Sequence, residues 1–166
     1  MSRWSYALVI AGLMSAMSTS HATVLVLMDS PTLAAKSDVI VVGHVTRKEA
    51  AWEGDRIITH VTFAVERTVK GQPDRELTLA VDGGTVNGIT MRTIGGAEFG
   101  PTDRSLLFLR RRSVGDLVVT GLAQGKLDVL RARDGIDRVR WTRTNASSLV
   151  PLNDALVEIA AKTRAP

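Results

Sequence analysis

Apolar stretches that end at turn-forming residues constrain the fold of this chain more than any other feature. The segment 39–45 is a run of β-branched residues, which is typical of a strand buried on both faces or nearly so. The segment 57–69 alternates, with Val61, Phe63 and Val65 on one side of a strand. A Glu-Gly-Asp turn lies between the two segments, so we predict that they pair as an antiparallel hairpin.

Further strands follow at a regular spacing, at 76–81, 105–109, 117–120, 126–133 and 136–141. The last two flank Asp134-Gly135, a favoured two-residue hairpin turn. None of the connections is long enough for the crossover helix that a parallel α/β fold requires. A count of about seven or eight short strands therefore predicts an all-β, mainly antiparallel barrel or sandwich.

Two helices are expected at the ends of this β-rich region. A short one covers 30–36, where Ser30 can cap the helix and Pro31 suits the first helical position. A closing helix is predicted over 148–162, because Leu152, Leu156 and Ile159 form one apolar stripe at helical spacing.

The first 22 residues have the layout of a secretory signal peptide. Arg3 is followed by an apolar run at 7–17 and then by Ser20-His21-Ala22, with small residues where a signal peptidase cleaves. This run is shorter than the ~20 residues of a membrane span. We therefore expect residues 23–166 to form a single exported β-rich domain without a transmembrane span, periplasmic or extracellular, and the preference for arginine over lysine suggests a bacterial source.

The chain contains no cysteine. An exported domain without disulfides must be stabilised by its core alone. The same absence excludes thiol nucleophiles, cysteine-ligated zinc and dithiol redox motifs.

Three segments resemble one kind of secreted protein. They are the S-D-V-x-x-x-G-x-V pattern within 33–45, the strand 61–71 that ends in Lys70-Gly71, and 99–109 with its Leu-Leu-Phe-Leu end. The segment 121–126 is similar to a G-x-x-Q-G-K motif of the same proteins. Together they resemble uncharacterised secreted bacterial OB-fold-like proteins, whose barrel is similar to the inhibitory module of tissue inhibitors of metalloproteinases.

The resemblance implies an OB-like barrel. This sequence departs from the pattern of those proteins at two positions. Thr102 stands where a glycine is usual, and Asp103 stands where a glutamate is usual. In the metalloproteinase inhibitors the amino terminus and its cysteine chelate the catalytic zinc of the protease. Here the expected mature terminus is Thr23 and no cysteine exists, so that mechanism does not carry over.

No cluster in the sequence predicts catalysis, a metal site or a cofactor site. Two histidines follow the signal peptide, and the hairpin register places His44 opposite Val65 and His60 opposite Glu49, roughly 16 Å apart along the strands. Neither a G-x-S-x-G elbow nor an H-E-x-x-H motif occurs. We expect a chain that is not an enzyme and, with few aromatic residues outside the predicted core, one that does not bind nucleic acid.

The predicted 126–141 hairpin is the candidate interaction surface, because basic side chains are concentrated on it and next to it. We expect it to bind an envelope or extracellular protein or an anionic glycan, although an ordinary charged outer face has the same pattern. A protease-inhibitor-like protein and, less favoured, a hydrolase remain as alternatives. The residues of the candidate surface are Lys126, Arg131, Arg133, Arg138, Arg140 and Arg143.

The glycine-rich segment 83–101 is the second candidate surface. Asp82-Gly83-Gly84 is expected to end a strand, 86–94 to form another short strand, and Gly95-Gly96 to turn the chain back. If 86–94 pairs in the sheet, the glycines are structural. If it does not, the segment is a long loop of a kind that is usually functional or disordered.

Overall fold

A computed structural model describes residues 26–112, 116–143 and 146–164 of the chain. The predicted signal peptide, residues 1–22, lies outside the described residues. The helical elements are α2 (Ser30–Lys36), the 3-10 turn η1 (Leu122–Gly125) and α3 (Leu152–Arg164). The strands are β1 (Val39–Glu53), β2 (Arg56–Lys70), β3 (Glu76–Val86), β4 (Ile89–Arg92), β5 (Arg104–Arg111), β6 (Leu117–Val119), β7 (Lys126–Asp128), β8 (Leu130–Arg131), β9 (Asp137–Arg143) and β10 (Ala146–Pro151).

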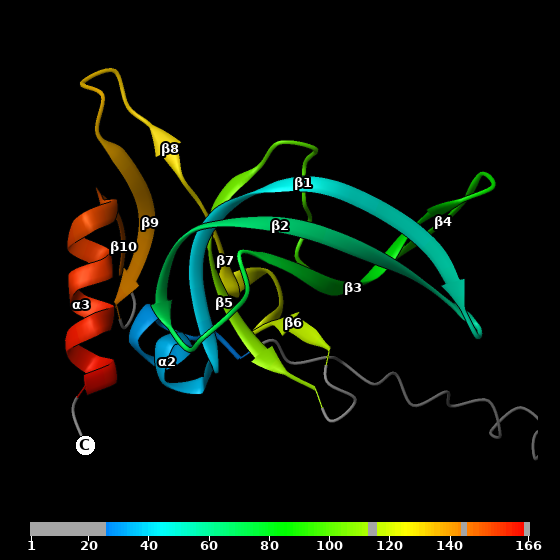
Figure 1. The fold of residues 1–166 in the computed structure, drawn as a ribbon, viewed down its shortest axis with the longest axis horizontal. Coiled ribbons are helices and arrows are strands. Elements are labelled where there is room, and N and C mark those ends of the chain that lie inside the picture. Colours follow the sequence, from blue (N-terminus) through cyan, green and yellow to red (C-terminus); the bar gives the residue numbers. More distant parts are fainter. Residues whose placement is uncertain (1–25, 113–115, 144–145, 165–166) are drawn as a thin grey trace, which may run out of the picture.

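The main sheet closes into a five-stranded barrel (Figure 1). Its strands follow the order β1-β2-β3-β6-β5, and β5 returns to pair with β1. All of these pairings are antiparallel except that of β3 with β6. The predicted all-β, mainly antiparallel class is therefore confirmed, and the closed barrel with added strands is consistent with an OB-like fold.

Strand β1 is buried on both faces over its first half, as its β-branched sequence predicts. Val39 and Val41 point into the barrel, where they pack with Phe63 in one core cluster. Ile40 and Val42 point outward and pack in a second cluster that includes residues of α2, α3 and β9. The first half of β1 thus joins two hydrophobic cores.

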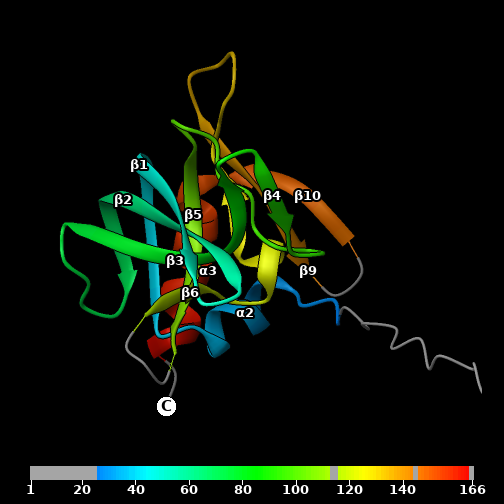
Figure 2. The same cartoon turned by 90° about the vertical axis from the view of Figure 1, so that its right-hand side faces the viewer.

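The second core is covered by a smaller layer outside the barrel. A three-stranded sheet in the order β10-β9-β8 packs together with α3 and α2. Figure 1 shows this layer at one end of the molecule, and the tips of the β1–β2 and β3–β4 hairpins extend toward the other end. In the view of Figure 2, α3 lies behind the barrel strands.

The first hairpin forms at the predicted place, and β1 and β2 turn at Gly54 and Asp55. Glu49 lies opposite His60, as predicted from the sequence. His44 lies opposite Ala64 and not Val65, because a register shift near Thr46 moves the pairing by one residue.

The glycine-rich segment pairs in the sheet, although not within the expected bounds. Strand β3 continues through Gly83 and Gly84, so these glycines do not end it. The chain turns instead at Asn87 and Gly88, which have φ values of 50° and 80° and suit a two-residue hairpin. Strand β4 then pairs with the end of β3. Because the segment forms paired strands and not a long loop, these glycines have a structural role.

Two further boundaries predicted from the sequence are wrong. The closing helix begins at Leu152, not at residue 148, because Pro151 disfavours helical geometry before it and 146–151 instead pairs with β9. The expected strand 126–133 is divided, since β7 pairs with β5 of the barrel while β8 pairs with β9. The chain does turn at Asp134 and Gly135, but the loop has three residues and not two, since Ala132 bonds to Ile136 and Arg131 lies opposite Asp137. The left-handed Gly135, with a φ of 77°, suits such a loop.

Gly43, in the middle of β1, is required by close packing against β2. A Cβ atom at this position would clash with the carbonyl oxygen of Ala64 and lie 2.7 Å from the ring of Phe63. We predict that Gly43→Ala lowers the free energy of unfolding by about 1–3 kcal/mol, because β1 must move away from β2. Urea denaturation measures this change.

The matched control is Gly88→Asn, since Gly88 has open space around it and its left-handed backbone tolerates asparagine. This control should change stability by only a few tenths of a kcal/mol. Equal losses in both variants would contradict the role assigned to Gly43.

Candidate functional site

Lys126 is the most buried member of the candidate basic surface. Its side chain is 8% exposed, and its ammonium group contacts Asp103 at 2.9 Å and also pairs with Asp128. Burial by itself would lower the pKa of Lys126, but the hydrogen bonds to Asp128 and Asp103 outweigh burial and raise it. Lys126 therefore acts as an internal cation, already neutralised within the protein.

Three of the candidate arginines are also paired with carboxylates. Arg131 contacts Asp137 at 2.9 Å, and Arg138 forms a two-pronged contact with Asp134 at 2.6 and 2.9 Å. Arg143 pairs with Glu158 on α3. The pKa of Asp134 is lowered to about 2 by the hydrogen bonds from Arg138 and the backbone of Ile136.

Arg133 and Arg140 differ from the other four basic residues of the surface. Both are exposed, and neither makes an ion pair or a side-chain hydrogen bond within the part of the chain that the structure describes. They are the members of the set whose charge is available to a ligand.

The small sheet does not gather the basic residues on one face. Val139 is buried toward α3, so Arg138 and Arg140, its neighbours on β9, point to the outer face. Arg131 lies opposite Asp137, which places it on the other face of the sheet. The predicted surface is thus divided between two faces and the turn.

A groove of about 440 Å³ lies beside the outer face of this sheet. Arg140 and the exposed Leu130 line one part of it, while the N-terminal segment around Leu27 and the η1 turn line the rest. The hydroxyls of Thr142 and Ser147, 2.9 Å apart, also line it. The groove therefore combines an unpaired cation, aliphatic side chains and hydroxyl groups.

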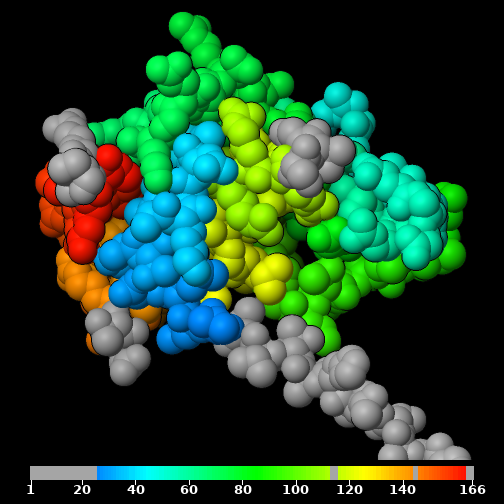
Figure 3. All heavy atoms as spheres, turned by 90° about the horizontal axis from the view of Figure 1, so that it is seen from below, coloured from blue at the N-terminus to red at the C-terminus, as the bar shows by residue number. Residues whose placement is uncertain are grey.

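One residue of the G-x-x-Q-G-K segment, Gln124, forms a wall of this groove by holding the N-terminal segment in place. Its side chain accepts a hydrogen bond from the Met28 amide at 2.7 Å and donates one to the Val26 carbonyl at 3.0 Å. Figure 3 shows the N-terminal segment, in blue, beside the yellow residues of this turn. Sequence reasoning noted the segment but did not assign this contact to it.

The two motifs of the C-terminal half meet in space. Asp103 accepts a hydrogen bond from the amide of Gly100 at 2.8 Å, and it forms an ion pair with Lys126. Lys126 also lies 5.4 Å from the ring centre of Phe99. Asp103 thus connects the 99–109 segment to the 121–126 segment.

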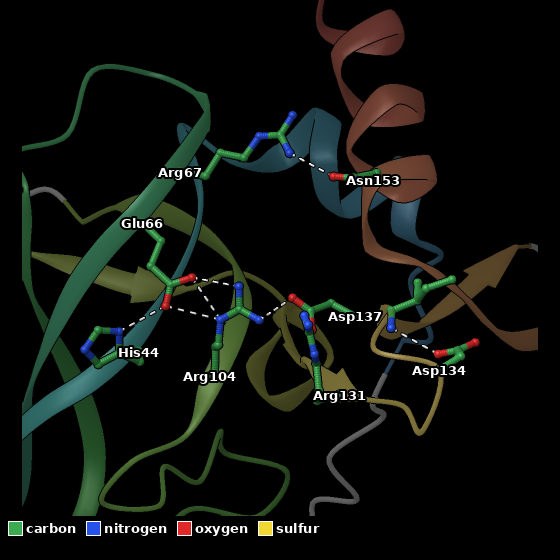
Figure 4. A network of polar contacts seen from close by, with 9 residues as sticks. His44, Glu66, Arg67, Arg104, Arg131, Asp134, Asp137 and Asn153 are labelled. Carbon is green, nitrogen blue, oxygen red and sulfur yellow. Dashed lines mark hydrogen bonds and ion pairs between the residues drawn. The ribbon is translucent and has the colours of Figure 1, made fainter.

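A network of polar contacts joins the barrel to the small sheet (Figure 4). Arg104 on β5 contacts Glu66 of β2 at 2.8 Å and Asp137 of β9 at 2.6 Å. His44 extends the network from Glu66 at 3.1 Å, and Arg131 extends it from Asp137. Hydrogen bonds from Arg104 lower the pKa of both Glu66 and Asp137 and so favour their ionised forms.

The histidines do not share a site. His44 pairs with Glu66, and His60 pairs with Glu53 at 2.7 Å. Within the described ranges, no group of three or more histidine, aspartate or glutamate side chains is arranged to hold a metal ion.

A second hollow, of about 280 Å³, opens where the glycine-rich segment crosses the barrel. Lys48 and Arg92 lie at its edge, and the apolar Val61 and Phe99 form part of its wall. The Lys48 ammonium group is bonded to the carbonyl oxygen of Phe99, so Lys48 has a partner within the protein. The paired glycine-rich segment therefore lines a cavity as well as turning the chain.

Comparison with known proteins gives no match: no family model, no curated protein and no solved structure is similar enough to this chain to be matched. Among the described helices, none has the length and apolar character needed to cross a membrane.

The network around Arg104 predicts a pH dependence. Glu66 and Asp137 have a lower pKa in the folded state than their ordinary pKa values of 4.5 and 3.8. Their contribution to the free energy of unfolding is therefore complete above those ordinary values. It is lost as the pH falls through the lower pKa values of the folded state. We predict that Arg104→Gln lowers the free energy of unfolding at pH 7 by about 1–2 kcal/mol. The difference from the unchanged protein should shrink at about pH 3.

Urea denaturation at the two pH values measures this difference. The control is Arg56→Gln. Arg56 is an exposed arginine next to the turn of the β1–β2 hairpin, and it contacts Asp82 at 3.3 Å. Surface pairs of this kind contribute ~0–1 kcal/mol. A difference for Arg104→Gln that stays constant with pH would contradict the network's role.

Proposed function

We propose that this chain is an exported, non-catalytic binding module of the cell envelope or exterior that binds an anionic chain such as an acidic glycan. The observation that carries the proposal is the unpaired Arg140 at the edge of the 440 Å³ groove. Four of the six candidate cations are already neutralised, so the charge left at Arg140 and Arg133 is what a ligand meets.

The dimensions and chemistry of the groove support this proposal. Its volume falls within the ~300–1,000 Å³ of typical ligand sites. A carboxylate or sulfate group of the ligand would pair with the guanidinium of Arg140. The nearby Leu130 and Leu27, both largely exposed, offer apolar surface to the face of a sugar ring.

Among the described residues that line the groove there is no histidine and one carboxylate, Asp128, which favours binding over acid–base catalysis there. The carboxylates nearest to the groove are held by cations, since Asp128 pairs with Lys126. A carboxylate already occupied by a lysine of the protein is poorly placed to exchange a proton with a ligand.

Retention on a heparin column in buffer of physiological salt tests the proposal. We predict that Arg133→Ser with Arg140→Ser lowers the salt concentration needed for elution, because both side chains contact the polyanion directly. The matched control is Arg131→Ser with Arg138→Ser, which removes the same charge from the same hairpin but takes away arginines that are already paired.

A second control, Arg75→Ser, removes an exposed arginine remote from the groove. Equal losses in all of these variants would show attraction by net charge alone and would sink the proposal. Full retention after replacement of all four hairpin arginines would do the same.

A further inference from the structure

Two exposed aliphatic side chains lie on neighbouring turns, away from both cores. Ile94 is 90% exposed at the turn after β4, and Leu122 is 39% exposed at the start of η1. The amide of Ala123 donates a hydrogen bond to the carbonyl of Gly95 at 2.9 Å, which holds the two turns together. Ile94 and Leu122 form what we term the aliphatic tip, and neither residue lines the groove of the proposed function.

The backbone at Leu122 is strained. Its φ of 59° lies in the left-handed region, which a branched aliphatic side chain rarely adopts and which glycine or asparagine would occupy at lower cost. With 39% of the side chain still exposed, burial compensates this strain only in part. Strain of this kind is concentrated where side chains are presented to ligands and partners.

The surroundings of the tip are positively charged. A hollow of about 90 Å³ beside Leu122 is lined by Arg110 and Arg112, with Asp82 as its carboxylate. Asp82 is shared between Arg112 at 3.8 Å and Arg56 at 3.3 Å, so its charge is fully matched.

Two further arginines near the tip are unpaired. Arg110 and Arg92 are exposed and make no ion pair with any residue in the described ranges. Glu98 is also exposed and without an ion pair in the described ranges, so it offsets one of these charges. Arg92, Arg110 and Arg112 still outnumber the two carboxylates near the tip, Asp82 and Glu98.

We propose that the aliphatic tip docks this protein on an anionic lipid surface, with Ile94 and Leu122 entering the boundary of the acyl chains and Arg92 and Arg110 contacting the lipid head groups. Protruding aliphatic side chains gain free energy when hydrocarbon replaces water around them. Basic side chains beside them add attraction to anionic lipids within a short distance of the surface. Exposed aliphatic side chains beside the unpaired Arg92 and Arg110 match a surface that combines negative charge with hydrocarbon, which is what an anionic lipid surface offers.

Co-sedimentation with vesicles tests the proposal. One set contains phosphatidylglycerol and phosphatidylcholine in equal amounts, and the other contains phosphatidylcholine alone. The full chain is used with Leu8→Ser, Ile10→Ser and Leu13→Ser in every sample, because the apolar run at 7–17 would bind lipid by itself.

We expect binding to the anionic vesicles to weaken at least about tenfold in the double variant Ile94→Ser with Leu122→Asn. The matched control is Leu149→Ser with Val157→Ser, which removes two aliphatic side chains that are 50% and 68% exposed elsewhere and should leave binding unchanged. Arg92→Ser with Arg110→Ser should also weaken binding, whereas Arg75→Ser should not.

A second measurement separates docking from folding. Because asparagine tolerates the left-handed backbone, Leu122→Asn should raise the urea midpoint while it weakens vesicle binding. A lower midpoint would show that Leu122 serves the core, and would overturn the proposal. So would absence of binding to anionic vesicles, equal binding to both vesicle types, or equal losses in the aliphatic control.

Discussion

The pairing of β1 with both β2 and β5 is the constraint on which the rest of the structure depends. It closes the barrel, and it makes β1 the strand whose two faces contribute to two different cores. Gly43 allows β1 to lie close to β2, since any larger residue would meet the backbone of Ala64. The outer core then positions the small sheet against α3, and the small sheet forms one side of the groove. A displacement of β1 would thus reach the candidate site without changing any residue in it.

Charge in this protein is used mainly for internal attachment. Arg104 holds the small sheet to the barrel through Glu66 and Asp137, and Lys126 holds two segments together through Asp103. Pairs that are partly shielded from water are worth more than exposed ones, because the surrounding dielectric is lower. A basic sequence therefore leaves a much smaller set of cations available outside. That is why the proposed function depends on the unpaired Arg133 and Arg140 and not on net charge.

The two proposed contacts with other molecules use different physical chemistry. The groove offers an unpaired guanidinium with hydroxyl and aliphatic neighbours, which suits a polar anionic chain. The aliphatic tip offers protruding Ile94 and Leu122 on a strained turn, which suits a fluid apolar boundary. Both are adjacent to η1, because Gln124 in the same turn binds the N-terminal segment that forms one wall of the groove.

By itself, the sequence determined the class of fold, because side-chain alternation and turn residues are local properties. The β1–β2 hairpin and the pairing of Glu49 with His60 follow from these local properties. The Asn87-Gly88 turn was equally available from local chemistry but was missed in favour of the neighbouring glycines. The start of α3 was predicted too early because helical spacing outweighed the local effect of Pro151. Pairs such as Arg138 with Asp134 join residues close in the chain. Only the tertiary structure decided the long-range pairs, because partners such as Arg104 and Glu66 meet only when the barrel closes.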